Sequence, residues 1–511
     1  MSGRKESKHL YDLIKSLSGS EKRYFKLYAS NHVMASGNKY IELFDQLDQQ
    51  QSPEAEYPDK KQKISKHLPR IRQYLYALIL KSLDAYYAEH SIEIKLRKML
   101  NSIEILFNKG LQEQCLKAVR RAKELAKKHE QHNYEFEIIR WEIAMNTHLS
   151  AKNLFKTINS LHEEQHTILG KNKLLLDYTA NGKKILMLKR VVGNSTMVQK
   201  RKAIEKIVDT KLINQKYSGT DFRTSLAYLN TKALYESSVG NNEVCYASLK
   251  EIIDLYGKYP YQVENHKLQY ISHYLFLLLQ SKHLKKYRES FDIVKKLRDL
   301  CEAWPELEWR IKENMLLQLV DLYSETGDFE KGDELSHEIE LFYKTMGAKT
   351  DRLHEVYAYF NLTNYFIIAG EYKKALVYCN KVLNYKIIPL RKDFDWYTRI
   401  LNMVINYELK NYQLLEYQLQ SFSVFLKKTS GKNRIEKSLL VFFHKLINIS
   451  DPKEETKEFN LFYLNLVRLL EPPPEKKLLD YFHLPAWVES KLYKKSFAAV
   501  LKEMRVENEL I

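Results

Sequence analysis

The chain has 511 residues, of which 44% are hydrophobic and 29% charged, with only 15 glycines and 11 prolines. This is the composition of a folded soluble protein, and the scarcity of turn residues predicts long helices. The formal charge is +18 and uneven: residues 1–210 hold 38 basic against 24 acidic side chains, while the remainder is nearly balanced. A local excess of one sign indicates a binding face, and compositional drift in an AT-rich genome is the alternative explanation.

Targeting and redox signals are absent from this sequence. The N-terminus has no apolar core of a secretory signal, and apolar runs such as residues 74–80 are too short to span a membrane. The four cysteines form no C-x-x-C pair and lie more than fifty residues apart: Cys115, Cys245, Cys301 and Cys379. Neither a disulfide framework nor a zinc ribbon is indicated, so we expect a cytoplasmic protein without a membrane segment.

Residues 1–90 are expected to form an N-terminal helical cap domain. Ser18 and Glu21 have capping-box spacing, which predicts a helix that turns Tyr24, Phe25, Leu27 and Tyr28 inward. A second helix is expected near 39–49 and a loop over 49–59. Pro69 is expected to begin a long helix with an apolar face formed by Ile71, Leu75, Leu78, Ile79 and Tyr86. A helix-turn-helix is the alternative, because a basic run follows the short helices: Lys60, Lys61, Lys63, Lys66, Arg70 and Arg72.

Residues 91–450 show an internal repeat. Eight short breaks separate amphipathic segments, and their first residues are 40 to 47 apart, which leaves room for two helices and their turns in each repeat. Glycine, or Lys-Asn, suits these turns because both tolerate the positive φ that closes a helix. The breaks are Lys109-Gly110-Leu111, Lys152-Asn153-Leu154, Gly193-Asn194, Gly240-Asn241, Lys282-His283-Leu284, Gly327-Asp328-Phe329, Gly370-Glu371-Tyr372 and Lys410-Asn411-Tyr412. Prolines 260, 305 and 389 are expected to end second helices.

Two of these repeats resemble the tetratricopeptide family. In residues 365–376, YFIIAGEYKKAL, an aromatic residue lies four before the glycine, another lies two after it, and a small residue lies five after it. Residues 322–332 match equally well, and Gly240 with Cys245 matches in part. The resemblance implies an all-α superhelix with a concave binding surface, although the period of about 43 exceeds the usual 34 residues of that family. Residues 451–511 are expected to form a C-terminal helical cap, with Pro485 starting one helix and a last helix over 496–506.

The densest positive charge lies in residues 171–206, which contain ten basic side chains against Asp177 and Glu205. Two neighbouring basic helices of this kind are able to follow a phosphate backbone, and a solvated helix face is the competing explanation. Nucleic-acid or ribonucleoprotein binding is therefore our alternative function. Its candidate residues are Lys183, Lys184, Lys189, Arg190, Lys200, Arg201 and Lys202.

One segment, His162-Glu163-Glu164-Gln165-His166, matches the H-E-x-x-H zinc motif. Glu164 places a charge where that motif is normally apolar, and no third ligand is evident nearby, so a solvated helix face explains it better. Phosphate-binding and nucleophile motifs, including G-x-x-x-x-G-K-[ST], G-x-G-x-x-G and G-x-S-x-G, are missing. We therefore expect no enzyme activity, metal or small-molecule cofactor.

Together, these features predict an all-α superhelix of about eight tetratricopeptide-like hairpins with a cap at each end. The expected function is that of a non-catalytic intracellular scaffold or adaptor that binds a protein partner on the concave face. Candidate contacts come from the first helix of the clearest repeat: Tyr357, Asn361 and Asn364.

Overall fold

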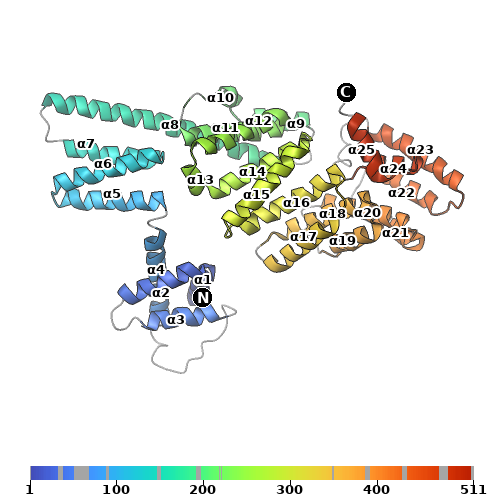
Figure 1. The fold of residues 1–511 in the computed structure, drawn as a ribbon, viewed down its shortest axis with the longest axis horizontal. Coiled ribbons are helices and arrows are strands. Elements are labelled where there is room, and N and C mark those ends of the chain that lie inside the picture. The colour runs from blue at the N-terminus through green and yellow to red at the C-terminus, as the bar shows by residue number, and fades with distance from the viewer. Residues whose placement is uncertain are drawn as a thin grey trace. The chain divides into compact units, whose positions relative to one another are not determined.

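The computed structural model describes residues 2–32, 38–50, 68–87, 91–146, 151–191, 197–217, 219, 221–347, 350–385, 392–428, 434–470 and 482–507. Every regular element in these ranges is a helix, from α1 to α25, and no strand occurs among them (Figure 1). The all-α prediction is therefore confirmed. None of the helices in the described ranges combines the length and apolar character needed to cross a membrane.

The chain divides into two compact units, and the boundary falls inside one helix, α8. The first unit consists of residues 1–177 and 220–224, and the second of residues 178–219 and 225–511. The first unit contains α1 (Ser2–Ser16), α2 (Gly19–His32), α3 (Asn38–Gln49), α4 (Leu68–Tyr87), α5 (Ile92–Asn108), α6 (Gln112–Lys128), α7 (His132–Met145) and most of α8 (Ala151–Val191).

Helices α1–α4 surround one apolar core. The expected capping box begins α2: the Ser18 amide donates to Glu21 Oε2 at 2.6 Å, and the Glu21 amide donates to Ser18 Oγ at 3.3 Å. Phe25 is buried and stacks on Phe44 of α3, whereas Leu27 is exposed, so its predicted inward position is wrong. Leu27 misses the core because it lies two residues, about 200°, from Phe25 on the helix. The expected helix at Pro69 is confirmed as α4, and the predicted loop over 49–59 lies almost entirely outside the described residues.

Helices α5, α6 and α7 pack in succession (Figure 1). A turn that the sequence did not predict joins α6 to α7, with Glu130 at a φ of +51°. Its carboxylate accepts hydrogen bonds from the amides of Phe222 and Arg223 at 2.7 and 2.8 Å. Those amides belong to the first turn of α11 (Phe222–Val239), where unpaired N–H groups and the helix dipole favour an anion. Glu130 therefore ties residues 220–224 to the first unit.

Helix α8 differs from the predicted second hairpin of the repeat. The expected turn at Lys152-Asn153-Leu154 is wrong, because these residues lie in the first turn of one continuous helix of 41 residues. The apolar side chains of Leu161 and Ile168 pack with Ile139 of α7, while Ile185 packs in a separate cluster with residues of α9 (Met197–Glu205) and α11. The helix continues because its buried stripe continues. The expected turn at Gly193-Asn194 lies outside the described residues.

The second unit is built mainly of paired helices joined by short turns. It contains the end of α8, then α9, α10 (Thr210–Asn214), most of α11, α12 (Asn242–Lys258), α13 (Tyr261–Asn265), α14 (Lys267–His283), α15 (Tyr287–Ala303), α16 (Glu308–Thr326), α17 (Gly332–Met346), α18 (Arg352–Ile368), α19 (Tyr372–Asn384), α20 (Lys392–Glu408), α21 (Tyr412–Lys428), α22 (Arg434–Leu446), α23 (Pro452–Leu470), α24 (Leu484–Leu492) and α25 (Phe497–Glu507). Each helix from α14 to α25 packs against the next. Pro260 and Pro305 follow the ends of α12 and α15 as predicted, and Pro389 lies outside the described residues.

The turns of six hairpins, one in the first unit and five in the second, share one backbone geometry. A residue at positive φ closes the first helix, and the fifth residue after it is buried in the hairpin. Glycine occupies most of these positions, as expected, while lysine occupies two of them. The turn residues are Gly110 (71°), Gly240 (88°), Lys285 (56°), Gly327 (75°), Gly370 (80°) and Lys410 (59°). The turn predicted at Lys282 therefore lies three residues later, because α14 continues to His283.

Gly332, five residues after Gly327, is held in place by an aromatic ring. A Cβ on Gly332 would overlap the ring of Tyr365, whose hydroxyl donates to the Asp328 carbonyl at 2.9 Å. We expect Gly332→Ala to reduce the free energy of unfolding by about 2 kcal/mol, because the ring must leave its position. Gly257→Ala, in α12 with open space around it, should be neutral or stabilising. Equal effects of the two substitutions in urea unfolding would contradict this packing.

The C-terminal helices confirm two expectations. Pro485 lies in the first turn of α24, and the last helix, predicted at 496–506, is α25. Trp487 is fully buried, and its indole N–H donates to Glu408 Oε1 of α20 at 2.7 Å. The Trp487 ring also packs against Phe443 of α22 and Phe459 of α23. Trp487 therefore joins α24 to α20, α22 and α23.

Candidate functional site

The three residues predicted as groove contacts lie on α18. All are half-buried. Asn361 Nδ2 donates to Asp321 Oδ1 at 2.9 Å and to the Leu317 carbonyl at 3.5 Å, both on α16. Asn364 Nδ2 donates to the Phe360 carbonyl of its own helix at 3.3 Å. Asn361 therefore holds α18 against α16, which leaves less of its amide for a partner.

Asp321 also joins α16 to α14. Lys282 Nζ lies 3.1 Å from Asp321 Oδ2 and 3.3 Å from the Gln318 carbonyl. The Lys282 side chain is 4% exposed, while that of Asp321 is 44% exposed. The first helices of three successive hairpins are thus linked by one polar chain, Lys282–Asp321–Asn361. Its members are 39 and 40 residues apart, close to one repeat.

A groove that the sequence did not reveal lies between α19, α20 and α21. Its volume is about 330 Å³, within the range of small-ligand and peptide pockets. Apolar side chains and amides line it, and none of the lining residues in the described part of the chain is acidic. The lining residues are Leu376, Asn380, Leu383, Arg399, Asn402, Met403, Leu414, Tyr417, Gln418, Ser421 and Phe422. We call this surface the α19–α21 groove.

The polar groups of the α19–α21 groove suit a peptide backbone. Gln418 Oε1 is buried and has no hydrogen-bond partner among the described residues. Asn402 Oδ1 accepts from Asn406 Nδ2 at 2.9 Å. Arg399 places its guanidinium 4.9 Å from the centre of the Phe425 ring, which holds a positive charge at the groove. Amides, one cation and exposed apolar side chains are the groups that bind an extended or helical protein segment.

A sequence signal for this groove exists in α21. The buried face of the helix contains Leu415, Leu419 and Phe422, while Leu414 and Tyr417 form a second apolar face that is exposed. An amphipathic helix needs only one such face to pack in its hairpin. A second apolar face therefore indicates a further contact. The spacing of the turns along the sequence does not indicate such a face.

The basic candidates lie on α8 and α9. Lys183, Lys184 and Lys202 are exposed, and Lys200 is half-buried. Arg201 is exposed and pairs with Glu205 at 2.9 Å. Lys189 and Arg190 belong to the last turn of α8, and their side chains lie outside the described residues. Adjacent helix positions point about 100° apart, so Lys200, Arg201 and Lys202 do not share one face of α9.

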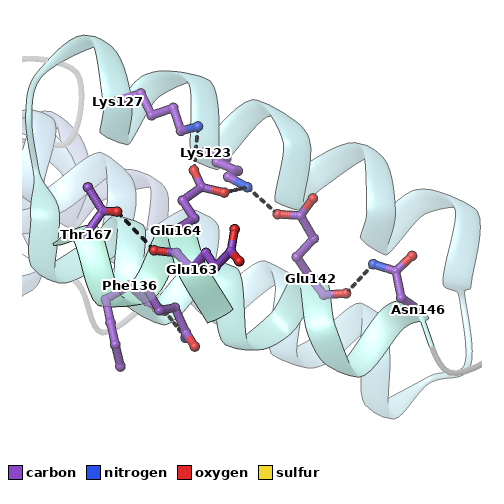
Figure 2. A network of polar contacts seen from close by, with 9 residues as sticks. Lys123, Lys127, Phe136, Glu142, Asn146, Glu163, Glu164 and Thr167 are labelled. Atoms are coloured by element: carbon purple, nitrogen blue, oxygen red, sulfur yellow. Dashed lines mark hydrogen bonds and ion pairs between the residues drawn. The ribbon is translucent and has the colours of Figure 1, made fainter. Parts of the chain in front are cut away.

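The H-E-x-x-H segment lies on α8, where its side chains join three helices (Figure 2). Glu164 Oε2 accepts a hydrogen bond from Lys123 at 2.8 Å, and Glu164 Oε1 forms an ion pair with Lys127 at 2.5 Å; both lysines lie on α6. Lys123 also pairs with Glu142 of α7 at 2.6 Å, as Figure 2 shows. Burial alone raises the pKa of Glu164, but the two lysines reverse this effect and hold the pKa below its ordinary value.

His162 of the same segment also has a hydrogen-bond partner, because its Nδ1 lies 3.2 Å from Gln165 Oε1. In the described part of the chain, no three His, Cys, Asp or Glu side chains are grouped so that they could hold a metal ion. The arrangement of Figure 2 fixes α6, α7 and α8 to one another.

The four cysteines all lie in described residues, where they are buried and form no disulfide. Burial raises the pKa of Cys301 to about 11 and raises that of Cys379 further above the ordinary value of a thiol. Neither side chain offers a thiolate near neutral pH, and the thiolate is the nucleophile and metal ligand in cysteine chemistry. These two cysteines therefore contribute packing.

Comparisons with known proteins give no relative. The chain matches no family model, no characterised protein and no solved structure. Its function has to be inferred from the geometry of its own surfaces.

Proposed function

We propose that the chain is a non-catalytic, cytoplasmic scaffold or adaptor that binds a segment of a protein partner. In this proposal the hairpins stack as a tetratricopeptide-like superhelix, and the α19–α21 groove is a principal contact. The recurring turn geometry and the family-like residues 365–376 support the stacking. The observation that carries the binding function is the α19–α21 groove itself, which combines amides with exposed apolar side chains and has no acidic group among its described lining residues.

The partner is a protein rather than a small molecule for a physical reason. Leu414 and Tyr417 face solvent at the rim, so a small ligand would leave their apolar surface uncovered, whereas a protein segment is able to cover both. Aromatic residues such as Tyr417 are also enriched among the side chains that contribute most to protein binding. Nucleic-acid or ribonucleoprotein binding through the basic N-terminal half is the alternative, and the exposed Lys183 and Lys184 of α8 support it.

Two matched variants of α21 test this function. Leu414 lines the groove and is 46% exposed, while Val424 lies on the same helix outside the lining and is 51% exposed. We expect Leu414→Asp to reduce recovery of a discrete protein partner at least tenfold, because an unpaired carboxylate would enter an apolar contact. Val424→Asp should retain the partner.

The measurement is affinity capture from native lysate at low and moderate salt, with and without nuclease, read by quantitative mass spectrometry. Circular dichroism melts establish that both variants are folded. Recovery that depends on nucleic acid would overturn the proposal in favour of the alternative. Equal recovery by wild type and Leu414→Asp would remove the α19–α21 groove from it.

A further inference from the structure

A second groove runs between α22 and α23, outside the surface considered above. Its volume is about 390 Å³. The α22 side contributes residues spaced three, four and seven apart, and the α23 side does the same, so one face of each helix lines the groove. The lining residues are Arg434, Lys437, Ser438, Val441, Phe442, Lys445, Glu458, Leu461, Phe462, Asn465 and Leu469. We call this surface the α22–α23 groove.

The floor of the α22–α23 groove is rigid and apolar. Phe442 and Phe462 are buried and stack with ring centres 4.0 Å apart. Asn465 Nδ2 donates to Ser438 Oγ at 2.7 Å across the two helices. Val441 and Leu461 lie above this floor and are exposed. A firm floor with exposed aliphatic side chains is suited to the apolar anchors of a partner helix.

The rim of the α22–α23 groove has an excess of positive charge. Glu458 is the one acidic residue among the described residues that line it, and Lys445 pairs with it at 2.9 Å. Arg434 and Lys437 remain, both exposed in the first turn of α22. Cations at that position oppose the helix dipole, so the stability of α22 does not account for them.

We propose that the α22–α23 groove binds an acidic amphipathic helix of a protein partner. Leucine-type side chains at positions i, i+4 and i+7 of that helix contact Val441 and Leu461. Its Asp or Glu side chains pair with Arg434 and Lys437. An apolar floor alone would accept any amphipathic helix, and the two cations select an acidic one. The proposal concerns a different surface from the α19–α21 groove, so either of the two can fail without the other.

The test pans an mRNA-display library of random 16-residue peptides on the full chain, with counter-selection on the Leu461→Asp variant. We expect the recovered peptides to combine apolar residues at helical spacing with Asp or Glu. The tightest of them should bind wild type by fluorescence anisotropy and lose at least tenfold in affinity for Leu461→Asp. Leu464→Asp is the matched control, because Leu464 lies on α23 with 51% exposure against 49% for Leu461 but does not line the groove.

A charge-reversed variant gives a second readout that does not depend on the apolar substitutions. Arg434→Glu with Lys437→Glu should weaken the acidic peptide at least tenfold, and added salt should then no longer weaken its binding, because it screens repulsion instead of attraction. Recovered peptides that are basic, or that bind Leu461→Asp as tightly as wild type, would overturn the proposal. A labelled 20-nucleotide single strand that binds wild type and not the charge-reversed variant, with no peptide recovered, would assign the two cations to nucleic acid instead.

Discussion

Replacing Asp321 with asparagine is expected to reduce the free energy of unfolding by about 3 kcal/mol, whereas Lys282→Met should cost less than about 1 kcal/mol. The asymmetry follows from burial. Removal of the Asp321 charge leaves the ammonium of Lys282 inside the protein at 4% exposure with no anion, while Asp321 is 44% exposed and hydrates without Lys282. Asp321 also keeps its hydrogen bond from Asn361.

A double-mutant cycle in urea measures this difference. The double variant Lys282→Met, Asp321→Asn should be nearly as stable as Lys282→Met alone, because the buried cation is gone. Asp333→Asn is the control, since Asp333 pairs with Lys374 at 2.7 Å where both side chains are well exposed, and it should cost less than about 1 kcal/mol. Equal losses for Asp321→Asn and Lys282→Met would contradict a buried cation at this position.

The repeat could be predicted from the sequence because its turns depend on local backbone chemistry. Gly110, Gly240, Gly327 and Gly370 adopt positive φ, which a residue without a Cβ adopts at little cost. The turn at Lys410 followed from its spacing and from the Lys-Asn pair. Glu130 also adopts positive φ, but with neither glycine nor the expected spacing its turn between α6 and α7 gave no signal.

The second hairpin could not be predicted, because Lys-Asn has no fixed conformation. Lys410-Asn411 closes a hairpin, while Lys152-Asn153 lies within α8. Tertiary packing decides between these outcomes: Leu415 is buried after the first pair, whereas an apolar stripe from Leu161 onward keeps α8 helical. That stripe is present in the sequence, but the Lys152-Asn153 pair at the expected spacing predicted a turn instead of a continuous helix.

The predicted site shares this limitation. The sequence placed Asn361 on a first helix correctly, yet its bond to Asp321 exists only once α16 and α18 pack, one repeat apart. Both grooves likewise combine residues from separate helices, and only a second apolar face, such as that of Leu414 and Tyr417, marks them locally. Periodicity therefore indicates which helices pair and leaves open which residues meet between hairpins.

Glu436 of α22 is expected to make the protein less stable as the pH rises from about 4.5 to neutrality. Burial raises the pKa of its carboxyl from 4.5 to about 7, and its Oε2 has no hydrogen-bond partner among the described residues. The folded protein then holds this proton more tightly than the unfolded chain does. Stability therefore falls between about pH 4.5 and pH 7, by about 3 kcal/mol in total at 1.36 kcal/mol per unit of pKa.

Glu436→Gln removes this ionisation, so the variant should match wild type near pH 4.5 and exceed its stability by about 3 kcal/mol at pH 8. Hydrogen–deuterium exchange of α22, compared between variants at the same pH, measures the difference locally. Glu454→Gln is the control, because Glu454 is exposed in the first turn of α23 and is hydrated in folded and unfolded chains alike. A constant difference between Glu436→Gln and wild type from pH 4.5 to pH 8 would show that the carboxyl ionises in the folded protein as it does in water. The surroundings of the Glu436 carboxyl would then admit more water than its burial indicates.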